Sequence, residues 1–223
     1  MTPPDILSYA VLGVVAYLLG SVPVALIMSA VLKRTDLRRI GSGNLGVLNT
    51  MFNVGKLPGL LTIVGHGILA ALTVFLAGWF PEGWFPWGWQ YPADWWVPMR
   101  DDVGLMVAMA GLTAGNMWQL FAKFRGSRGS TTVGWALLVA APLMLLVLFG
   151  VWLAAILAIR RNVPAARVLH AAIPVVFGLM QGSWTFAIGG AVIAALLTLK
   201  VAFSGDDATA LGVYRRFGIN ENR

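Results

Sequence analysis

The stretch ILSYAVLGVVAYLLGSVPVALIMSAVL, Ile6–Leu32, contains no charged residue. As a helix it is long enough to cross a hydrocarbon core about 30 Å thick, which needs about 20 residues. Four further stretches have the same near-continuous apolar character: Leu57–Phe80, Val103–Leu120, Val133–Ile159 and Trp184–Leu199. None alternates between polar and apolar residues as the strands of a membrane barrel do. The pattern therefore predicts an all-α integral membrane protein.

The composition agrees with this prediction. Of the 223 residues 58% are apolar and 11% are charged, whereas soluble proteins carry about 25% charged residues. The absence of cysteine excludes disulfides and thiolate metal sites, and two distant histidines give no metal cluster, so no cofactor is expected. Ile6–Leu32 is too long for a signal-peptide core and has no basic flank before it, which predicts a retained helix.

The basic residues gather in four regions of the chain. By the positive-inside rule these regions are expected on the cytoplasmic face of a multi-pass plasma-membrane protein. Pro81–Asp102 is instead acidic and rich in tryptophan, which predicts an interfacial aromatic belt on the outer face. The basic regions contain Lys33, Arg34, Arg38, Arg39 and Lys56; Lys123, Arg125 and Arg128; Arg160, Arg161 and Arg167; and Lys200, Arg215, Arg216 and Arg223.

This charge distribution predicts about seven membrane segments, some short, with the N-terminus outside and the C-terminus cytoplasmic. Val133–Ile159 has both ends in the cytoplasm, so it must cross twice, and Pro142 near its middle permits two helices joined by a tight turn. Val168–Gln181 and Trp184–Leu199 form a last hairpin through Gly182 and Ser183. We expect a single transmembrane domain over residues 1–223, with 199–223 as a cytoplasmic tail.

The loop Asp36–Asn49, DLRRIGSGNLGVLN, has the composition of a phosphate site. Its glycines free the backbone to direct N–H groups toward one anion, as anion-binding nests do. Arg38 and Arg39 add forked positive charge suited to phosphate. The alternative is a flexible loop whose arginines only set the topology. The neutral groups of this loop are Gly41, Ser42, Gly43, Asn44, Gly46 and Asn49.

Lys123–Thr132, KFRGSRGSTT, repeats this chemistry with three cations, two glycines and four hydroxyl groups. Thr131 or Thr132 is expected to cap the following helix and to bring its N-terminal dipole near an anion. A positive-inside connector is again the alternative. Upstream, Gly20-Ser-Val-Pro23 interrupts the first apolar segment, which predicts a kink beside a cavity or a packing interface.

Taken in order, these motifs resemble the bacterial acyl-phosphate:glycerol-3-phosphate acyltransferases, the PlsY family. Gly20–Pro23 and the Asp36–Asn49 loop resemble its first motif, and Gly115, Phe121, Phe124, Gly126 and Gly129 align with its second, which binds the phosphate of glycerol 3-phosphate. The resemblance implies transfer of a fatty acyl group from acyl phosphate to glycerol 3-phosphate, forming lysophosphatidic acid without a metal or coenzyme A. Membrane lipid is a partner and nucleic acid is not.

From the loops and the resemblance together we expect two sets of site residues, with the first loop near the donor and the second holding the acceptor. The catalytic set is Ser21, Arg38, Ser42 and Asn44. The substrate-binding set is Gly41, Gly43, Gly46, Asn49, Asn116, Lys123, Arg125, Gly126, Arg128, Gly129 and Thr132.

The chain departs from the family pattern at several positions. Phe52 stands where the family has an arginine, and in the second apolar segment His66 and Leu69 stand for an aspartate and a lysine. In the second motif Asn116 and Gln119 replace a histidine and a proline, and Gly126-Ser-Arg-Gly129 replaces Gly-Gly-Lys-Gly. The third motif has only a displaced echo in Tyr214–Glu221.

Three functions remain open at this point. The first is acyl transfer, in which positioned cations neutralise two phosphates and the phosphate of the donor accepts the proton. His66, about 15 Å along its helix from Lys56, is expected to be a buried hydrogen-bonding residue, and His170 is no better supported as a base. The second is a non-catalytic paralogue that binds a lipid or phosphate headgroup. The third, a transporter or channel, lacks the usual intramembrane charges.

Overall fold

The structure of the protein is a computed structural model that describes residues 6–79, 102–160 and 162–204. Every regular element within these ranges is helical, which confirms the predicted all-α class. The tryptophan-rich Pro81–Asp101 stretch and Tyr214–Glu221 lie outside the described residues. The elements are α1 (Ile6–Gly20), α2 (Val24–Lys33), η1 (Leu37–Arg39), α3 (Val47–Asn53), α4 (Lys56–Trp79), α5 (Asp102–Met117), η2 (Leu120–Ala122), α6 (Ser130–Ala140), α7 (Pro142–Ile159), α8 (Asn162–Gln181) and α9 (Trp184–Ser204).

The first apolar segment is one membrane span broken into α1 and α2. The break falls at Ser21–Pro23, where the sequence predicts it, because proline has no N–H to continue the helical hydrogen bonds. Ser21 N–H still donates to Tyr17 O at 2.9 Å, so α1 ends with its last turn intact. The short amphipathic α2 then leads into the Asp36–Gly46 loop.

Six apolar helical segments within the described ranges are long enough to cross a membrane. The one predicted segment that is not among these six is the first half of Val133–Ile159. It forms α6, an 11-residue helix of about 16 Å that is shorter than a bilayer is thick. Pro142 is the first residue of α7, so the predicted division of Val133–Ile159 is confirmed. Gly182, with φ 61°, turns α8 into α9 as expected.

Two predicted helix starts are wrong. Thr131 and Thr132 do not cap α6, because the helix begins at Ser130 and Gly129, with φ 81°, turns the chain into it. No described side chain makes a capping bond there. The predicted helix at Val168 begins at Asn162, because Pro164 falls in the first turn, where a missing N–H costs nothing.

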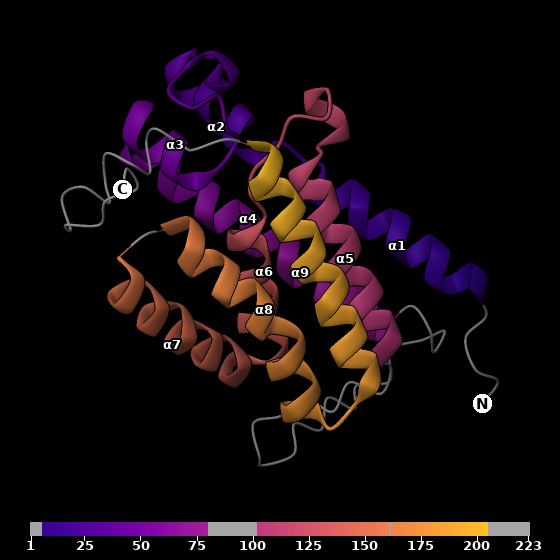
Figure 1. The fold of residues 1–223 in the computed structure, drawn as a ribbon. Helices are drawn as coiled ribbons and strands as arrows, with labels where there is room; N and C mark the ends of the chain where they lie inside the picture. The colour runs from indigo at the N-terminus through magenta and orange to yellow at the C-terminus, as the bar shows by residue number, and fades with distance from the viewer. Residues whose placement is uncertain (1–5, 80–101, 161, 205–223) are drawn as a thin grey trace.

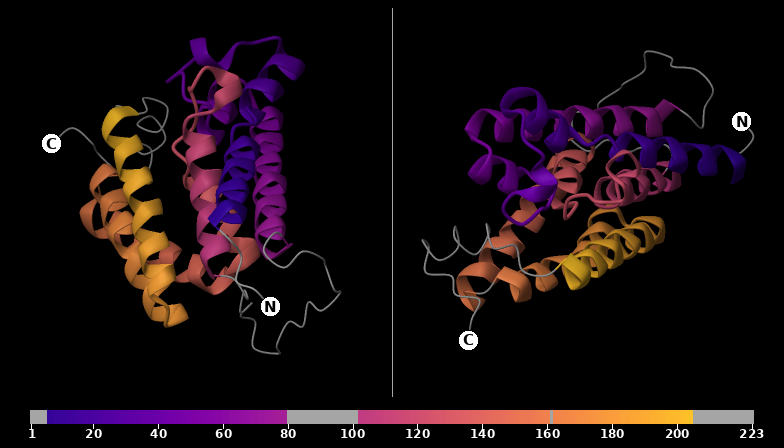
Figure 2. Two further views of the ribbon diagram at one scale, coloured as in Figure 1. Left: turned by 90° about the vertical axis from the view of Figure 1, so that its right-hand side faces the viewer. Right: turned by 90° about the horizontal axis from the view of Figure 1, so that it is seen from above.

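Helix α5 lies at the centre of the bundle, against α1, α4, α6 and α9 (Figures 1 and 2). Glycines bring α1 and α5 together: a Cβ at Gly20 would collide with Leu112 O, and one at Gly115 with Tyr17 O. Small residues allow this approach, which matters in lipid because apolar burial gives no net drive for helix association. The close α1–α5 contact places the Ser21 break beside the C-terminus of α5.

The two glycine-rich loops meet at one end of the bundle. In Figure 1, α2, α3 and the loop after α5 gather at the same end as the C-terminus of α9. We call this the loop end, defined by residues 36–46 and 123–129. Beneath it Ala25, Leu37, Leu45 and Ala122 form a small buried cluster, with 0% exposure each. This cluster fixes the first loop on α2 and η2.

We predict that Gly115→Ala lowers the stability of the folded protein by about 1–3 kcal/mol, because the added methyl group forces the α1 and α5 backbones apart. Thermal unfolding in detergent measures the change as a lower apparent Tm. Gly150→Ala on α7 is the matched control, since a Cβ there meets nothing within 4 Å. An equal Tm for the two variants would contradict the tight α1–α5 contact.

Candidate functional site

The first loop is held by an ion pair at its start. Asp36 accepts the N–H of Arg38 at 3.1 Å and two guanidinium N–H groups of the same residue at 2.9 Å each. The guanidinium of Arg38 holds the pKa of the Asp36 carboxyl at about 2, and the carboxylate raises the pKa of Arg38. Arg38 is therefore oriented by Asp36, and much of its charge is neutralised within the loop.

The buried side chain of Asn49 organises the rest of this loop. Its Nδ2 donates to Ile40 O at 3.0 Å and to Asn44 O at 2.9 Å. Its Oδ1 accepts from Ser42 N at 3.3 Å and from Asn53 Nδ2 at 2.8 Å. A Cβ at Gly41, which has φ +58°, would collide with the Asn49 amide. Glycine at this position therefore allows one asparagine to close the loop.

The second loop is fastened to the C-terminal end of α5. Ser127 N–H donates to Asn116 O at 2.9 Å, and Ser127 Oγ donates to Asn116 Oδ1. Gly129 N–H donates to Ser127 Oγ at 3.0 Å. The two loops join where Leu45 N–H donates to Gly126 O at 3.4 Å. The backbone of the second loop thus links α5 to the start of α6 and to the first loop.

Side chains from α4 and α9 complete this support. Asn116 Nδ2 lies 3.4 Å from His66 Nε2, so the predicted buried hydrogen-bonding role of His66 is confirmed. Lys200 Nζ donates to Met117 O at 2.7 Å and lies 5.3 Å from the centre of the Trp118 ring. A cation at a helix C-terminus is favourable both for the helix dipole and for the unpaired carbonyls.

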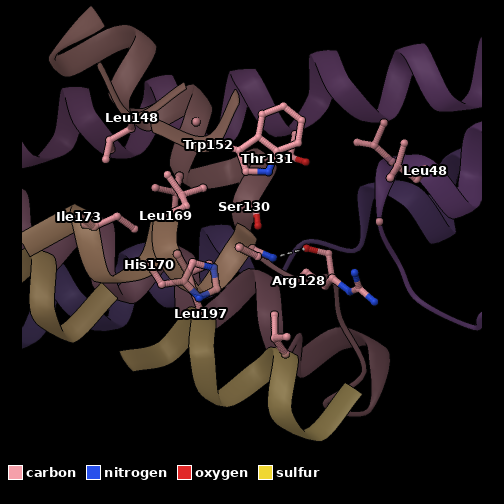
Figure 3. Close-up of a pocket in the computed structure, with 18 of the residues that line it drawn as sticks. Leu48, Arg128, Ser130, Thr131, Leu148, Trp152, Leu169, His170, Ile173 and Leu197 are labelled. Atoms are coloured by element: carbon pink, nitrogen blue, oxygen red, sulfur yellow. Dashed lines mark hydrogen bonds between the residues drawn. The ribbon is translucent and has the colours of Figure 1, made fainter. Parts of the chain in front are cut away.

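A cavity of about 390 Å³ extends from the loop end into the bundle. Its mouth is polar, with Asn44, Ser127, Arg128, Ser130 and Thr131 among its lining residues. Its interior lies between α6, α7, α8 and α9 and is mainly apolar. Figure 3 shows Arg128 and Leu48 toward one side of the cavity and Leu148, Leu169 and Ile173 toward the other. The apolar lining includes Leu137, Leu145, Leu148, Phe149, Trp152, Leu169, Ile173 and Leu197.

The mouth of the cavity is built to receive an anion. Arg128 is the cation among the described lining residues, and none of those residues is a carboxylate. The N–H groups of Ser130 and Thr131, at the first turn of α6, donate to no described residue. These free N–H groups and the helix dipole favour negative charge at this point. A ligand with an anionic head and an apolar tail matches both halves of the cavity.

The sequence-predicted residues divide into three groups. Asn44, Gly46, Asn49, Arg128 and Gly129 line the cavity. Lys123 and Arg125 are exposed on the second loop, and Ser42 on the first. The others lie outside the described lining. Five of them shape or support the loops: Arg38, Gly41, Gly43, Asn116 and Gly126. Ser21 and Thr132 are buried, and their hydroxyl groups make no hydrogen bond to a described residue.

Sequence reasoning missed most of the apolar lining and one polar residue within it. The residues on α7 and α8 are ordinary membrane-helix residues, and their spacing does not tell a cavity from a lipid-facing surface. His170 on α8 also lines the cavity. The available signal was its rarity, because the chain has two histidines.

The glycerol-3-phosphate acyltransferase family model matches residues 10–204. The chain belongs to this family. Among its relatives, glycerol-3-phosphate acyltransferase 2 of Moorella thermoacetica is 33% identical over 82% of this chain and 84% of its own length. The glycerol-3-phosphate acyltransferase of Laribacter hongkongensis is 36% identical over 70% of each chain.

Two solved structures share the fold. Both are crystal structures of PlsY, an integral membrane glycerol 3-phosphate acyltransferase. The glycerol 3-phosphate form matches with a TM-score of 0.67 and 24% identity, over 86% of this chain and 88% of that one. The lysophosphatidic acid form matches with a TM-score of 0.64 and 21% identity, over 86% and 87%. Family membership and the apolar helices make this chain a multi-pass membrane protein.

We predict that Asn49→Ala opens the first loop at least about tenfold more often, because each of its buried hydrogen bonds contributes about 0.5–1.5 kcal/mol. The measurement is the rate of trypsin cleavage at Arg39, whose side chain is 86% exposed. Gly41→Ala should raise the cleavage rate as much as Asn49→Ala does. Asn53→Ala, which removes one hydrogen bond to Asn49, should raise it less. Equal cleavage rates in Asn49→Ala and the unaltered protein would contradict this role.

Proposed function

We propose that this family member transfers a fatty acyl group from an acyl phosphate to glycerol 3-phosphate and releases lysophosphatidic acid and phosphate. The observation that carries the proposal is the shape of the cavity, which has a cationic mouth at the loop end and an apolar interior among α6–α9. An acyl phosphate has the same division, with a charged head and a hydrocarbon chain. The names of the curated relatives support the acceptor and the reaction class.

The donor enters with its chain in the apolar interior and its phosphate at the mouth. Arg128 and the free N–H groups of Ser130 and Thr131 then neutralise the donor phosphate, so the proposal assigns this part of the second loop to the donor, where the sequence predicted the acceptor. Because an acyl phosphate is already an activated donor, fixing its position and charge can supply much of the acceleration.

The acceptor approaches from the loop end. Lys123 and Arg125, exposed on the second loop, attract its phosphate, and Asn44 offers hydrogen bonds at the mouth. Of the predicted catalytic residues, Asn44 lines the cavity mouth, which supports a contact with substrate, whereas the Asp36 ion pair supports a structural role for Arg38 in the loop. Ser42 N–H donates to Asn49 Oδ1 and so helps to hold the first loop closed.

The reaction balances without a cofactor. The glycerol hydroxyl oxygen attacks the acyl carbonyl carbon, a new carbon–oxygen ester bond forms, and the bond from that carbon to the phosphate oxygen breaks. The phosphate leaves with the electron pair and takes the hydroxyl proton. We place this chemistry on the cytoplasmic face, because the basic residues of the loop end follow the positive-inside rule.

We predict that Arg128→Gln lowers acyl transfer about 100-fold or more, since it removes the cation of the cavity mouth and leaves a shorter, neutral amide in its place. The assay uses purified protein in lipid, palmitoyl phosphate and labelled glycerol 3-phosphate. Arg160→Gln, an exposed arginine at the C-terminus of α7, is the control and should keep full activity. Full activity in Arg128→Gln would contradict the proposed phosphate site.

The same assay separates catalysis from binding. Lysophosphatidic acid formed by the unaltered protein supports acyl transfer. Saturable glycerol 3-phosphate binding without product would instead indicate a non-catalytic binding member, as the half-exposed Phe52 in place of the family arginine allows. The absence of both product and binding would overturn the proposal.

We predict that Leu148→Trp shifts the donor preference from palmitoyl toward decanoyl phosphate, because the larger ring fills part of the apolar interior. Leu148 is 4% exposed and lines the cavity. Leu146→Trp on the outer side of α7, where the leucine is 64% exposed, is the matched control and should leave the preference unchanged. An unchanged ratio of kcat/KM for the two donors in Leu148→Trp would show that the chain lies elsewhere.

A further inference from the structure

His170 is a buried polar residue in the wall of the cavity that the proposed reaction does not yet use. It lies on α8 between Leu169 and Ile173, is 4% exposed, and lines the cavity (Figure 3). Its Nδ1 lies 3.0 Å from Thr198 Oγ1 on α9. The other ring nitrogen, Nε2, makes no hydrogen bond to a described residue. A histidine in this position is available to a ligand through Nε2.

The hydroxyl group of Thr198 determines which ring nitrogen carries the proton. Other helical hydroxyl groups donate to the carbonyl four residues earlier: Ser29 to Ala25 at 2.6 Å, Thr62 to Pro58 at 2.8 Å and Thr73 to Leu69 at 2.8 Å. Thr198 makes no such bond among the described residues, and its one hydrogen bond is to His170.

If His170 donated to Thr198, the hydroxyl proton would have no described acceptor. Thr198 is exposed within the apolar span Trp184–Phe203 of α9, where surrounding hydrocarbon offers its hydroxyl proton no acceptor. The arrangement that satisfies both groups has Thr198 donating to Nδ1. A neutral imidazole carries one proton, so that proton is on Nε2.

We propose that His170 Nε2–H donates a hydrogen bond to the acyl carbonyl oxygen of the donor, and that Thr198 is the positioning residue that fixes this tautomer. The inference rests on the proposed function, because the ligand is the acyl phosphate. Nε2 makes no hydrogen bond to a described residue, so its N–H is available to an acceptor oxygen of the ligand. The donor phosphate is held at the mouth by Arg128, whereas His170 lies among apolar residues, where the carbonyl joins head to tail.

The hydrogen bond strengthens as the reaction proceeds. Negative charge builds on the carbonyl oxygen when the glycerol hydroxyl attacks, and a fixed N–H donor stabilises that charge more than it stabilises the neutral carbonyl. His170 keeps its proton throughout the step, and the hydroxyl proton still leaves with phosphate. Among the charged residues on the surrounding elements, Arg128 lines the same cavity, Arg167 lies one turn earlier on α8, and Lys200 follows Thr198 on α9.

Nitrogen NMR of the protein with ¹⁵N-labelled histidine tests the tautomer directly, since the chain has two histidines and His170→Gln assigns their signals. We expect His170 to show an unprotonated Nδ1 and a protonated Nε2. Thr198→Val should convert it to a tautomer mixture. Adding a non-transferable alkyl phosphonate analogue of the donor should shift the Nε2 signal. A protonated Nδ1, or an Nε2 signal that does not respond to saturating analogue, would overturn the proposal.

Kinetics test the contribution to catalysis. His170→Leu should lower kcat about 100- to 1,000-fold while KM for glycerol 3-phosphate stays within about twofold, as expected for loss of one donor to a developing oxyanion. Thr198→Val should lower kcat less, and Thr198→Ser should restore it. Thr73→Val on α4 removes a comparable hydroxyl away from the cavity and serves as the control.

Unchanged kcat in His170→Leu would overturn the catalytic contribution. A higher KM for the acyl phosphate with unchanged kcat would also overturn the catalytic contribution, because it would indicate that His170 contacts the donor phosphate rather than the carbonyl. If the unaltered protein forms no product, the proposed function fails, but the NMR response to the analogue still decides whether His170 contacts the ligand. The two failures are thereby distinguishable.

Discussion

The C-terminal end of α5 is the point on which the rest of the loop end depends. A helix that ends near a membrane surface leaves carbonyl groups without partners, and these must be satisfied within the protein. Here Asn116 O accepts from Ser127 N–H and Met117 O from Lys200, while the Asn116 side chain reaches both Ser127 and His66. One helix end thereby fixes α4, α9 and the second loop relative to one another. Because Gly126 O in turn accepts from Leu45 N–H, the first loop is also positioned by this helix end.

This support explains why the cavity has two different ends. Ser127 and Gly129 are held by α5, so α6 starts at Ser130 with its free N–H groups directed at the mouth. Helices α7, α8 and α9 pack beyond it and contribute apolar side chains. An anion therefore meets fixed donors at the loop end, while a hydrocarbon chain meets a mainly apolar region in which the polar His170 also lies. The division follows from where the helices begin and end.

Much of the fold was predictable from sequence, and less of the site. Long uncharged stretches and the prolines at 23 and 142 predict the spans and their breaks, because hydropathy and a missing N–H act locally. The start of α8 was missed, because proline in a first turn does not stop a helix. Of two similar arginines, Arg128 lines the cavity whereas Arg38 pairs with Asp36. That difference depends on tertiary placement, as does the position of His170, and no local pattern contains either.

The departures from the family pattern take on a physical meaning in this arrangement. Asn116 and His66, which stand where the resemblance leads us to expect a histidine and an aspartate, contact each other within the support at the end of α5, and neither is among the cavity-lining residues. Phe52 is 51% exposed and also lies outside that lining. Arg128, which stands where the resemblance leads us to expect a lysine, puts a positive charge at the mouth and has a planar fork of donors. The replacements thus change how the loops are held more than what the ligand meets, and this favours retention of acyl transfer over a headgroup-binding role alone.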